Sequence, residues 1–148
     1  MGDQHPSVEP IHGGVVNAIA VRFFRSPAGD QLAWVALADI LLAARFPDES
    51  APNFLADLHR DAAGDTLLIE TPDGVETAVA FWLGRCLLEA AVDMGWVSSD
   101  VMDQFLAEAS AATIVAVGPM PQAELVSFTE RAIAAQDERM ASFRRVST

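Results

Sequence analysis

The sequence Thr71-Pro72-Asp73-Gly74 lies between two short strand-like segments, 66–69 and 76–80. Asp-Gly is a strong turn signal when strand-like residues flank it, so this stretch predicts a β-hairpin. The residues from Phe81 to Met94 follow directly and are apolar on most sides of a helix, which is typical of a buried helix. Gly95 then stands where a helix C-cap glycine belongs. The stretch therefore predicts a hairpin that leads into a buried helix.

A similar pattern occurs earlier in the chain, around Ser26-Pro27-Ala28-Gly29. The β-branched and aromatic residues of 15–24 predict one strand before this turn, and residues 31–35 predict its return strand. Residues 36–45 then predict a helix, with Leu37 and Ile40 on its apolar face and Asp39 pointing elsewhere. The chain thus uses a hairpin-then-helix module twice.

The remaining elements are expected to be helical. Ser50 can cap a short helix, Ser98 or Ser99 can cap a helix over 100–112, and residues 113–117 are either a short strand or the end of that helix. A breaker at 118–121 precedes a last helix over about 122–145. We therefore expect an α+β fold: a flexible arm over 1–14, a core domain over 15–117 built from the two modules, and a C-terminal helix within 122–148 that packs on the core or mediates oligomerisation.

Composition narrows the classes of function. The 148 residues include 21 acidic and 9 basic side chains, for a net charge of −12, which disfavours direct contact with a phosphate backbone. No apolar stretch approaches the roughly 18 residues of a membrane span, and the N-terminus lacks a basic, apolar leader. The single Cys86 is consistent with a reducing compartment. We expect a cytoplasmic protein that does not bind membranes.

Candidate catalytic and metal-binding residues are few. The three histidines lack the spacing of a zinc site, and Cys86 within an apolar helix is typical of a buried small hydrophobe. The carboxylates, among them Asp39 and Glu76, are scattered and are interpreted as a solvated face. No Gly-rich phosphate loop or dinucleotide fingerprint is present. We therefore expect no catalytic residues, no metal and no cofactor, and a function other than catalysis.

Residues 17–24 and 34–41, joined by the first turn, resemble the opening of phage antirepressor N-terminal domains, including the Bro-N type. Residues 53–60 fall where such domains place a second short helix, and Asp73-Gly74 with 81–83 is similar to their second hairpin and next helix. The resemblance covers about residues 17–110. It implies a phage or mobile-element regulator of transcription that binds a repressor or another basic DNA-binding protein. The chain departs from the family in its acidity and its lack of lysine.

Two other functions stay open: an acidic protein that mimics DNA, as an inhibitor or accessory subunit of a DNA-acting complex, and a domain that binds a small ligand or catalyses a reaction in the cleft between the modules. Acidic residues on the expected turns and on the segment after the first helix are the candidate partner contacts. These are Asp30, Asp48, Glu49, Asp73 and Glu76.

Overall fold

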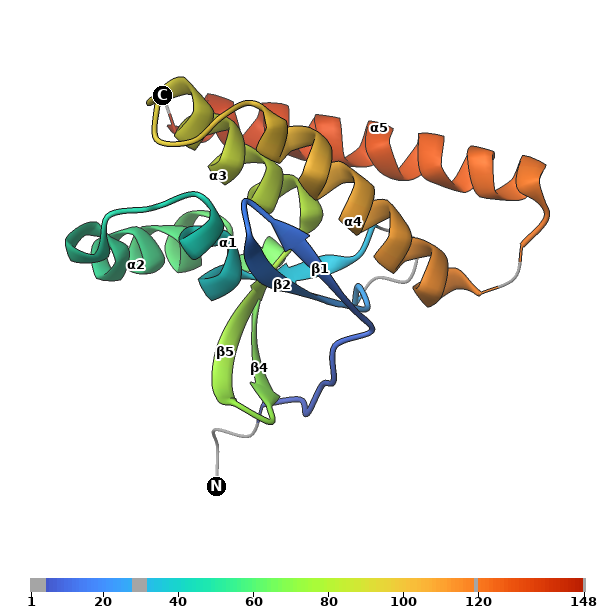
Figure 1. The fold of residues 1–148 in the computed structure, drawn as a ribbon, viewed down its shortest axis with the longest axis horizontal. Coiled ribbons are helices and arrows are strands. Elements are labelled where there is room, and N and C mark those ends of the chain that lie inside the picture. Colours follow the sequence, from blue (N-terminus) through green and yellow to red (C-terminus); the bar gives the residue numbers. More distant parts are fainter. Residues whose placement is uncertain (1–4, 28–31, 119, 148) are drawn as a thin grey trace.

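A computed structural model describes residues 5–27, 32–118 and 120–147 and shows an α+β fold (Figure 1). Its antiparallel sheet has the strand order β1-β2-β3-β5-β4. The strands are β1 (His12–Val16), β2 (Ile19–Phe24), β3 (Trp34–Ala36), β4 (Thr66–Thr71) and β5 (Gly74–Val79). The helices are α1 (Leu37–Ala43), η1 (Asp48–Ser50), α2 (Ala51–Asp61), η2 (Ala63–Asp65), α3 (Phe81–Asp93), α4 (Asp100–Val117) and α5 (Gln122–Ser147).

The second predicted module is confirmed. β4 and β5 pair from Thr66↔Val79 to Thr71↔Gly74, with Pro72 and Asp73 as the loop between them. Gly74 has a φ of +119°, a value that L side chains rarely adopt, so the glycine of the Asp-Gly pair is required by the backbone. α3 follows after Ala80 and contains the buried residues Trp82 and Leu88.

The prediction of one strand over 15–24 was wrong, because the chain reverses in the middle of that range. β1 and β2 form a hairpin in which Val16 pairs with Ile19, and the loop between them is Asn17-Ala18. Both loop residues have positive φ, 52° and 62°, which matches a type I′ turn. Asparagine tolerates this region well, but alanine stands where glycine is usual, so the sequence lacked the familiar turn signal.

The expected arm also differs from the structure after its first residues. β1 begins at His12, and Ser7 forms a parallel bridge with Glu70 of β4, supported by a hydrogen bond from the Val8 N–H to the Glu70 carbonyl at 2.9 Å. Gly13 and Gly14 were interpreted as loop residues. Gly14 is instead a place of close approach, because a Cβ there would overlap the carboxylate of Glu108 on α4. Residues 1–4 of the expected arm lie outside the described residues.

The first module is present in altered form. β2 pairs with β3 through Phe23↔Val35 and Phe24↔Trp34, and α1 follows, so the expected return strand exists. β3 also pairs with β5, and this joins the two modules in a single sheet. Part of the expected Pro-Ala-Gly turn, residues 28–31, lies outside the described residues.

The helices enclose a core of aromatic side chains. α4 continues to Val117, so the helical interpretation of 113–117 holds. The rings of Phe81 on α3 and Phe105 on α4 stack with centroids 5.2 Å apart, and the Phe23 ring of β2 has its centroid 6.0 Å from that of Phe105. Gly84 permits this packing, since a Cβ there would lie 2.9 Å from the Phe105 ring.

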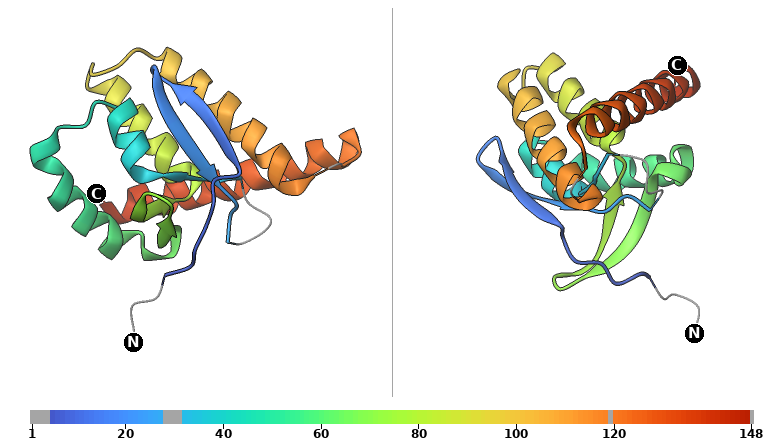
Figure 2. Two further views of the ribbon diagram at one scale, coloured as in Figure 1. Left: turned by 60° about the horizontal axis from the view of Figure 1, so that its bottom comes forward. Right: turned by 90° about the vertical axis from the view of Figure 1, so that its right-hand side faces the viewer.

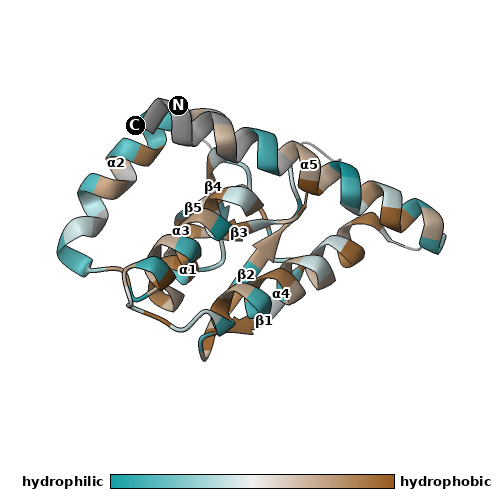
Figure 3. Cartoon of the chain, turned by 90° about the horizontal axis from the view of Figure 1, so that it is seen from above, coloured by the Kyte–Doolittle hydropathy of each residue, from teal (hydrophilic) through white to brown (hydrophobic). Residues whose placement is uncertain are grey.

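Figures 1 to 3 show how the helices lie relative to the two hairpins. In Figure 1 the β4–β5 hairpin extends away from α3, α4 and α5, and Figure 2 shows the β1–β2 hairpin beside α4. α5 packs on α3 at the outside of the molecule, and the part of α5 that is coloured by hydropathy in Figure 3 carries both hydrophilic and hydrophobic residues. Among the described residues, none of the helices has both the length and the apolar character needed to cross a membrane.

Candidate functional site

A cluster of one cation and three carboxylates joins β2, α1 and the β4–β5 hairpin. The Arg22 guanidinium donates from Nε to Asp39 Oδ2 at 2.9 Å and from Nη1 to Glu76 Oε2 at 2.6 Å. Asp73, in the hairpin loop, has Oδ2 3.3 Å from the same Nη1. The Thr71 hydroxyl lies 2.8 Å from Glu76 Oε2 and accepts a hydrogen bond from the Asp73 N–H at 3.1 Å. We call these five residues the Arg22 cluster.

The contacts within the Arg22 cluster favour the charged forms of Arg22 and Glu76. Hydrogen bonds from Arg22 lower the pKa of Glu76, with a smaller contribution from Thr71, and hydrogen bonds to Glu76 and Asp39 raise the pKa of Arg22. The side chains of Asp39 and Glu76 are only 12% and 16% exposed. The expectation that both belong to a solvated face was therefore wrong. These two carboxylates are 17 and 54 positions from Arg22 in the sequence, and the sheet order brings them together.

An apolar groove lies beside the Arg22 cluster. It has a volume of about 270 Å³, and its walls come from α1, β4 and β5. Leu68 and Val75 are 39% and 56% exposed, so two large aliphatic side chains on neighbouring strands face the solvent here. The lining residues are Leu37, Ala38, Leu41, Leu68, Val75, Glu76 and Thr77. We call this feature the hairpin groove.

Two glutamates lie at the margin of the hairpin groove. Glu76 lines it directly, and Glu70 lies opposite the exposed Val75 in the β4–β5 register. α2 comes near the groove at Thr77, whose hydroxyl lies 3.4 Å from His59 Nε2. The groove thus combines exposed aliphatic side chains with carboxylates at its margin.

The predicted contact residues fall in different places. Asp73 and Glu76 come together in the Arg22 cluster, Asp73 exposed and Glu76 half-buried. Asp48 and Glu49 are exposed in η1, which precedes α2 and is separated from His59 by about 15 Å of helix. Asp30 lies outside the described residues.

The histidine and cysteine side chains considered for chemistry lie outside the Arg22 cluster. His12 Nε2 lies 3.3 Å from Glu108 Oε1, and the other Glu108 oxygen accepts the Val15 N–H at 2.7 Å, which is the first cause of the lowered pKa of Glu108. Cys86 is half-buried on α3. Within the part of the chain that the structure describes, no three His, Cys, Asp or Glu side chains gather in a way that could hold a metal ion.

Sequence reasoning missed Arg22, Leu68 and Val75. A signal existed for Arg22, because it is a charged residue within an otherwise apolar strand, 19–24, and such a charge needs a partner when it is partly buried. Leu68 precedes the buried Ile69 in β4, and Val75 precedes the half-buried Glu76 in β5. Their exposure follows from which face of the hairpin the helices cover, and the sequence pattern alone does not show this face.

Comparison with family models, with curated proteins and with solved structures finds no match for this chain.

Proposed function

We propose that this chain is a non-enzymatic regulatory protein that binds a basic, amphipathic segment of another protein in the hairpin groove. The observation that carries the proposal is the exposure of Leu68 and Val75 beside Glu70 and Glu76. Exposed apolar side chains that are bordered by polar residues mark interaction sites, and burying them drives association. The groove carries both the apolar contact area and the charge for such a partner.

The acidic residues at the groove favour a partner with basic side chains. Glu70 and Asp73 are exposed, and the Arg22 cluster contains three carboxylates for one guanidinium. With a net charge of −12 over the chain, this surface favours encounter with a basic protein. Lysine or arginine side chains beside an apolar stripe would place their charges on Glu70 and Asp73 and their apolar neighbours on Leu68 and Val75.

A basic DNA-binding protein fits this description. The resemblance to phage antirepressor N-terminal domains implies such a partner, and an antirepressor acts by occupying the repressor so that it leaves its operator. We therefore propose a repressor-like partner and an antirepressor-like role in transcription regulation.

A second candidate is favoured by the charge alone. If the acidic residues act together as a DNA mimic, binding depends on total charge and not on the apolar groove. The two functions differ in how much binding depends on Leu68. Binding of an amphipathic segment in the groove needs its apolar side chain, whereas DNA mimicry does not. The lowered pKa of Glu76 disfavours this carboxyl as a general acid at neutral pH, because that role needs a raised pKa.

Site-specific photocrosslinking tests the proposal. A photoreactive amino acid is placed at position 68 in the groove, or at position 115 on α4, where Val115 has comparable exposure at 53% and lies outside the groove lining. Each protein is irradiated in a lysate of the organism that encodes it, and the crosslinked peptides are identified by mass spectrometry.

We expect position 68 to capture a DNA-binding protein through a basic, amphipathic peptide that position 115 does not capture. Identical captures at both positions, or none, would contradict the proposal. Affinity capture with substituted chains then separates the two functions. Binding that is lost in the charge-neutral variants Glu70→Gln and Asp73→Asn, at two exposed positions, but retained in Leu68→Ser would favour the DNA mimic instead.

A further inference from the structure

Resting on the proposed function, we propose that the basic segment of the partner binds as an extended strand that pairs with the edge of β4, where residues 6–8 of this chain compete with it. β4 stands at the end of the sheet order, so β5 covers one of its sides and the other side is an edge. An edge strand presents backbone N–H and C=O groups to a further strand. Adding a strand at such an edge is a common way for a sheet to bind an extended peptide.

The N-terminal segment of the chain itself shows that this edge accepts a strand. Ser7 forms a parallel bridge with Glu70 of β4. In this bridge the Glu70 N–H donates to the Pro6 carbonyl at 2.8 Å, and the Glu70 carbonyl accepts the Val8 N–H at 2.9 Å. Figure 1 shows the segment beside the β4–β5 hairpin. Both backbone groups of Glu70 therefore point away from β5.

Leu68 continues this edge beside the hairpin groove. In an antiparallel pair, alternate residues direct their backbone groups to the same side, so the N–H and C=O of Leu68 also point away from β5. Within the part of the chain that the structure describes, the bridge at Glu70 is the only pairing on this edge. The exposed side chain of Leu68 lines the groove. An incoming strand can thus pair with the backbone of Leu68 and cover its side chain.

The side chains on the exposed face of β4 indicate the sequence of the incoming strand. Leu68 and Glu70 are both exposed and stand two positions apart, so they lie on the same face of β4. A paired strand places two of its own side chains beside them, also two positions apart. An apolar side chain fits beside Leu68, and a lysine or arginine fits beside Glu70. We therefore expect apolar and basic residues at alternate positions of the partner segment.

Residues 6–8 limit access to this edge. A strand that spans both Leu68 and Glu70 needs the backbone groups of Glu70, which Pro6 and Val8 already occupy. The two hydrogen bonds at Glu70 each contribute little net free energy, because water replaces them when they open. A hollow of about 440 Å³ lined by residues 7–9 and 70–72 shows that the segment does not pack closely on the hairpin. An incoming strand can therefore displace it, at a cost in affinity.

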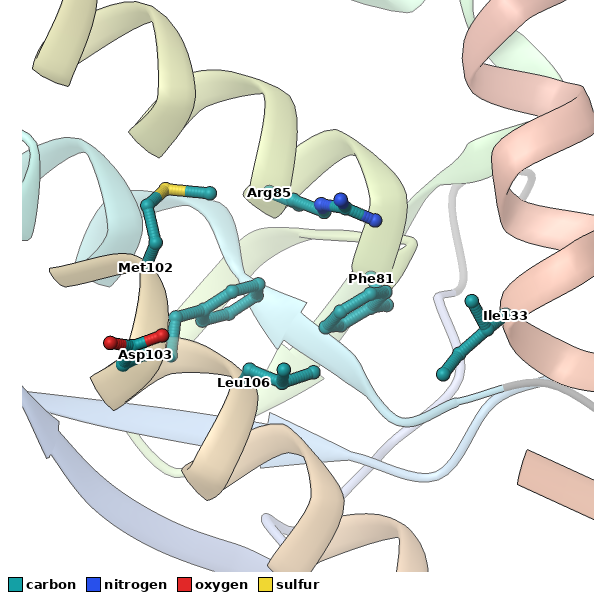
Figure 4. Close-up of a pocket in the computed structure, with 7 residues that line it drawn as sticks. Phe81, Arg85, Met102, Asp103, Leu106 and Ile133 are labelled. Atoms are coloured by element: carbon teal, nitrogen blue, oxygen red, sulfur yellow. The ribbon is translucent and has the colours of Figure 1, made fainter. Parts of the chain in front are cut away.

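Nuclear magnetic resonance titration of the full chain with a short peptide tests the proposal. The peptide acetyl-Lys-Thr-Val-Thr-Lys-Thr-amide has the expected alternation. Two further versions carry N-methyl groups either on the lysines and the valine or on the threonines. Because alternate residues of a strand present their N–H groups to the same side, only one of these two sets can face β4. The amides of Leu106 and Ile133 are the reference signals, since both residues line a separate cavity between α3, α4 and α5 (Figure 4).

Two substitutions at one position test the competition by residues 6–8. Val8→Pro removes the N–H that the Glu70 carbonyl accepts, so the segment is held less firmly. Val8→Ala is the matched control, because it shortens the side chain and keeps this N–H. Thermal unfolding of both variants checks that the fold is retained.

We expect saturable shifts of the Leu68 and Glu70 amide signals, while the reference signals stay in place. One N-methylated peptide should bind at least fivefold more weakly than the unmodified peptide, and the other should bind within twofold of it. Val8→Pro should bind the unmodified peptide at least threefold more tightly than Val8→Ala does.

Three results would overturn the proposal: no saturable shift at Leu68 even in Val8→Pro, equal binding of the two N-methylated peptides, or equal affinities of the two Val8 variants. The proposed function can fail or stand separately, because it is tested by photocrosslinking at position 68. A basic protein captured there, together with equal binding of the two N-methylated peptides, would support the groove as the binding site and overturn only the strand pairing.

Discussion

Arg22 contacts Asp39 through both its backbone and its side chain: the Arg22 N–H and Nε each donate to Asp39 Oδ2 at 2.9 Å. This pair links the middle of β2 to α1. The Arg22 guanidinium also donates to Glu76, which links β5 to β2. The two modules are therefore joined by an ion cluster as well as by the pairing of β3 with β5.

Arg22→Met removes the cation while keeping an apolar stem of similar length. Asp39 and Glu76 would then be largely buried without a counter-charge, so we expect the free energy of unfolding to fall by about 2 to 3 kcal/mol. Urea unfolding at pH 7 measures this. Arg60→Met is the control, because Arg60 on α2 pairs with Asp57 and Asp61 at the exposed surface, and no measurable loss is expected there. Equal effects of the two substitutions would contradict the structural role of the cluster.

The lowered pKa of Glu76 predicts a pH dependence of stability. Its pKa in the folded protein lies below the value of about 4.3 for an unfolded glutamate, so its contribution is complete above that value and is lost as the pH falls through the folded pKa. Glu76→Gln should therefore be less stable than the wild type at pH 7, and the difference should shrink as the pH falls below about 4.3. Urea midpoints at several pH values check this. Glu49→Gln, at an exposed position, should follow the wild type throughout. A difference that stays constant with pH would argue against the ion pair.

Gly14→Ala tests the close approach of α4 to β1. The new Cβ would overlap the Glu108 carboxylate, which would have to move and would release the Val15 N–H. We expect a loss of about 1 to 2 kcal/mol in the free energy of unfolding, measured by urea denaturation. Gly13→Ala is the matched control, since a Cβ there meets nothing within 4 Å. The double variant Gly14→Ala/Glu108→Ala should lose less than the sum of the two single losses. If Gly13→Ala is as costly as Gly14→Ala, the effect is a property of the backbone and not of the contact.

Ala18→Gly tests the unexpected turn between β1 and β2. Ala18 has a φ of 62°, which disfavours alanine by comparison with glycine, so the substitution should raise the free energy of unfolding by about 0.5 to 1 kcal/mol. Ala20→Gly, within β2, should lower it instead, because glycine weakens a strand interior. Thermal unfolding distinguishes the two signs. Destabilisation by Ala18→Gly would show that residues 17 and 18 do not form this turn.

The sequence predicted the elements that local signals define. Asp73-Gly74 predicted the β4–β5 hairpin, and the apolar run from Phe81 predicted α3 and its burial. The Asn17-Ala18 turn was not predicted because Ala18 has a positive φ, a conformation that glycine would have indicated and alanine does not. Local reasoning could not find it.

The sites depend on contacts that the sequence pattern does not encode. Arg22 meets Asp39 and Glu76 because β3 places the first module beside β5, and no periodicity specifies that order. Asp39 was expected to point away from the core, but its carboxylate turns toward β2, where the side chain is 12% exposed. The exposure of Leu68 and Val75 could not be predicted either, because the sequence does not specify which face of the hairpin the helices cover.

The most direct test of the central proposal is the displacement of DNA. The DNA-binding protein captured at position 68 is mixed with a fluorescently labelled operator fragment, and the anisotropy of the label is followed as the chain is added. We predict that the wild-type chain releases the DNA, that Leu68→Ser releases it at least tenfold less effectively, and that Val115→Ser acts as the wild type does. DNA that stays bound at saturating chain, or release that Leu68→Ser leaves unchanged, would contradict the account.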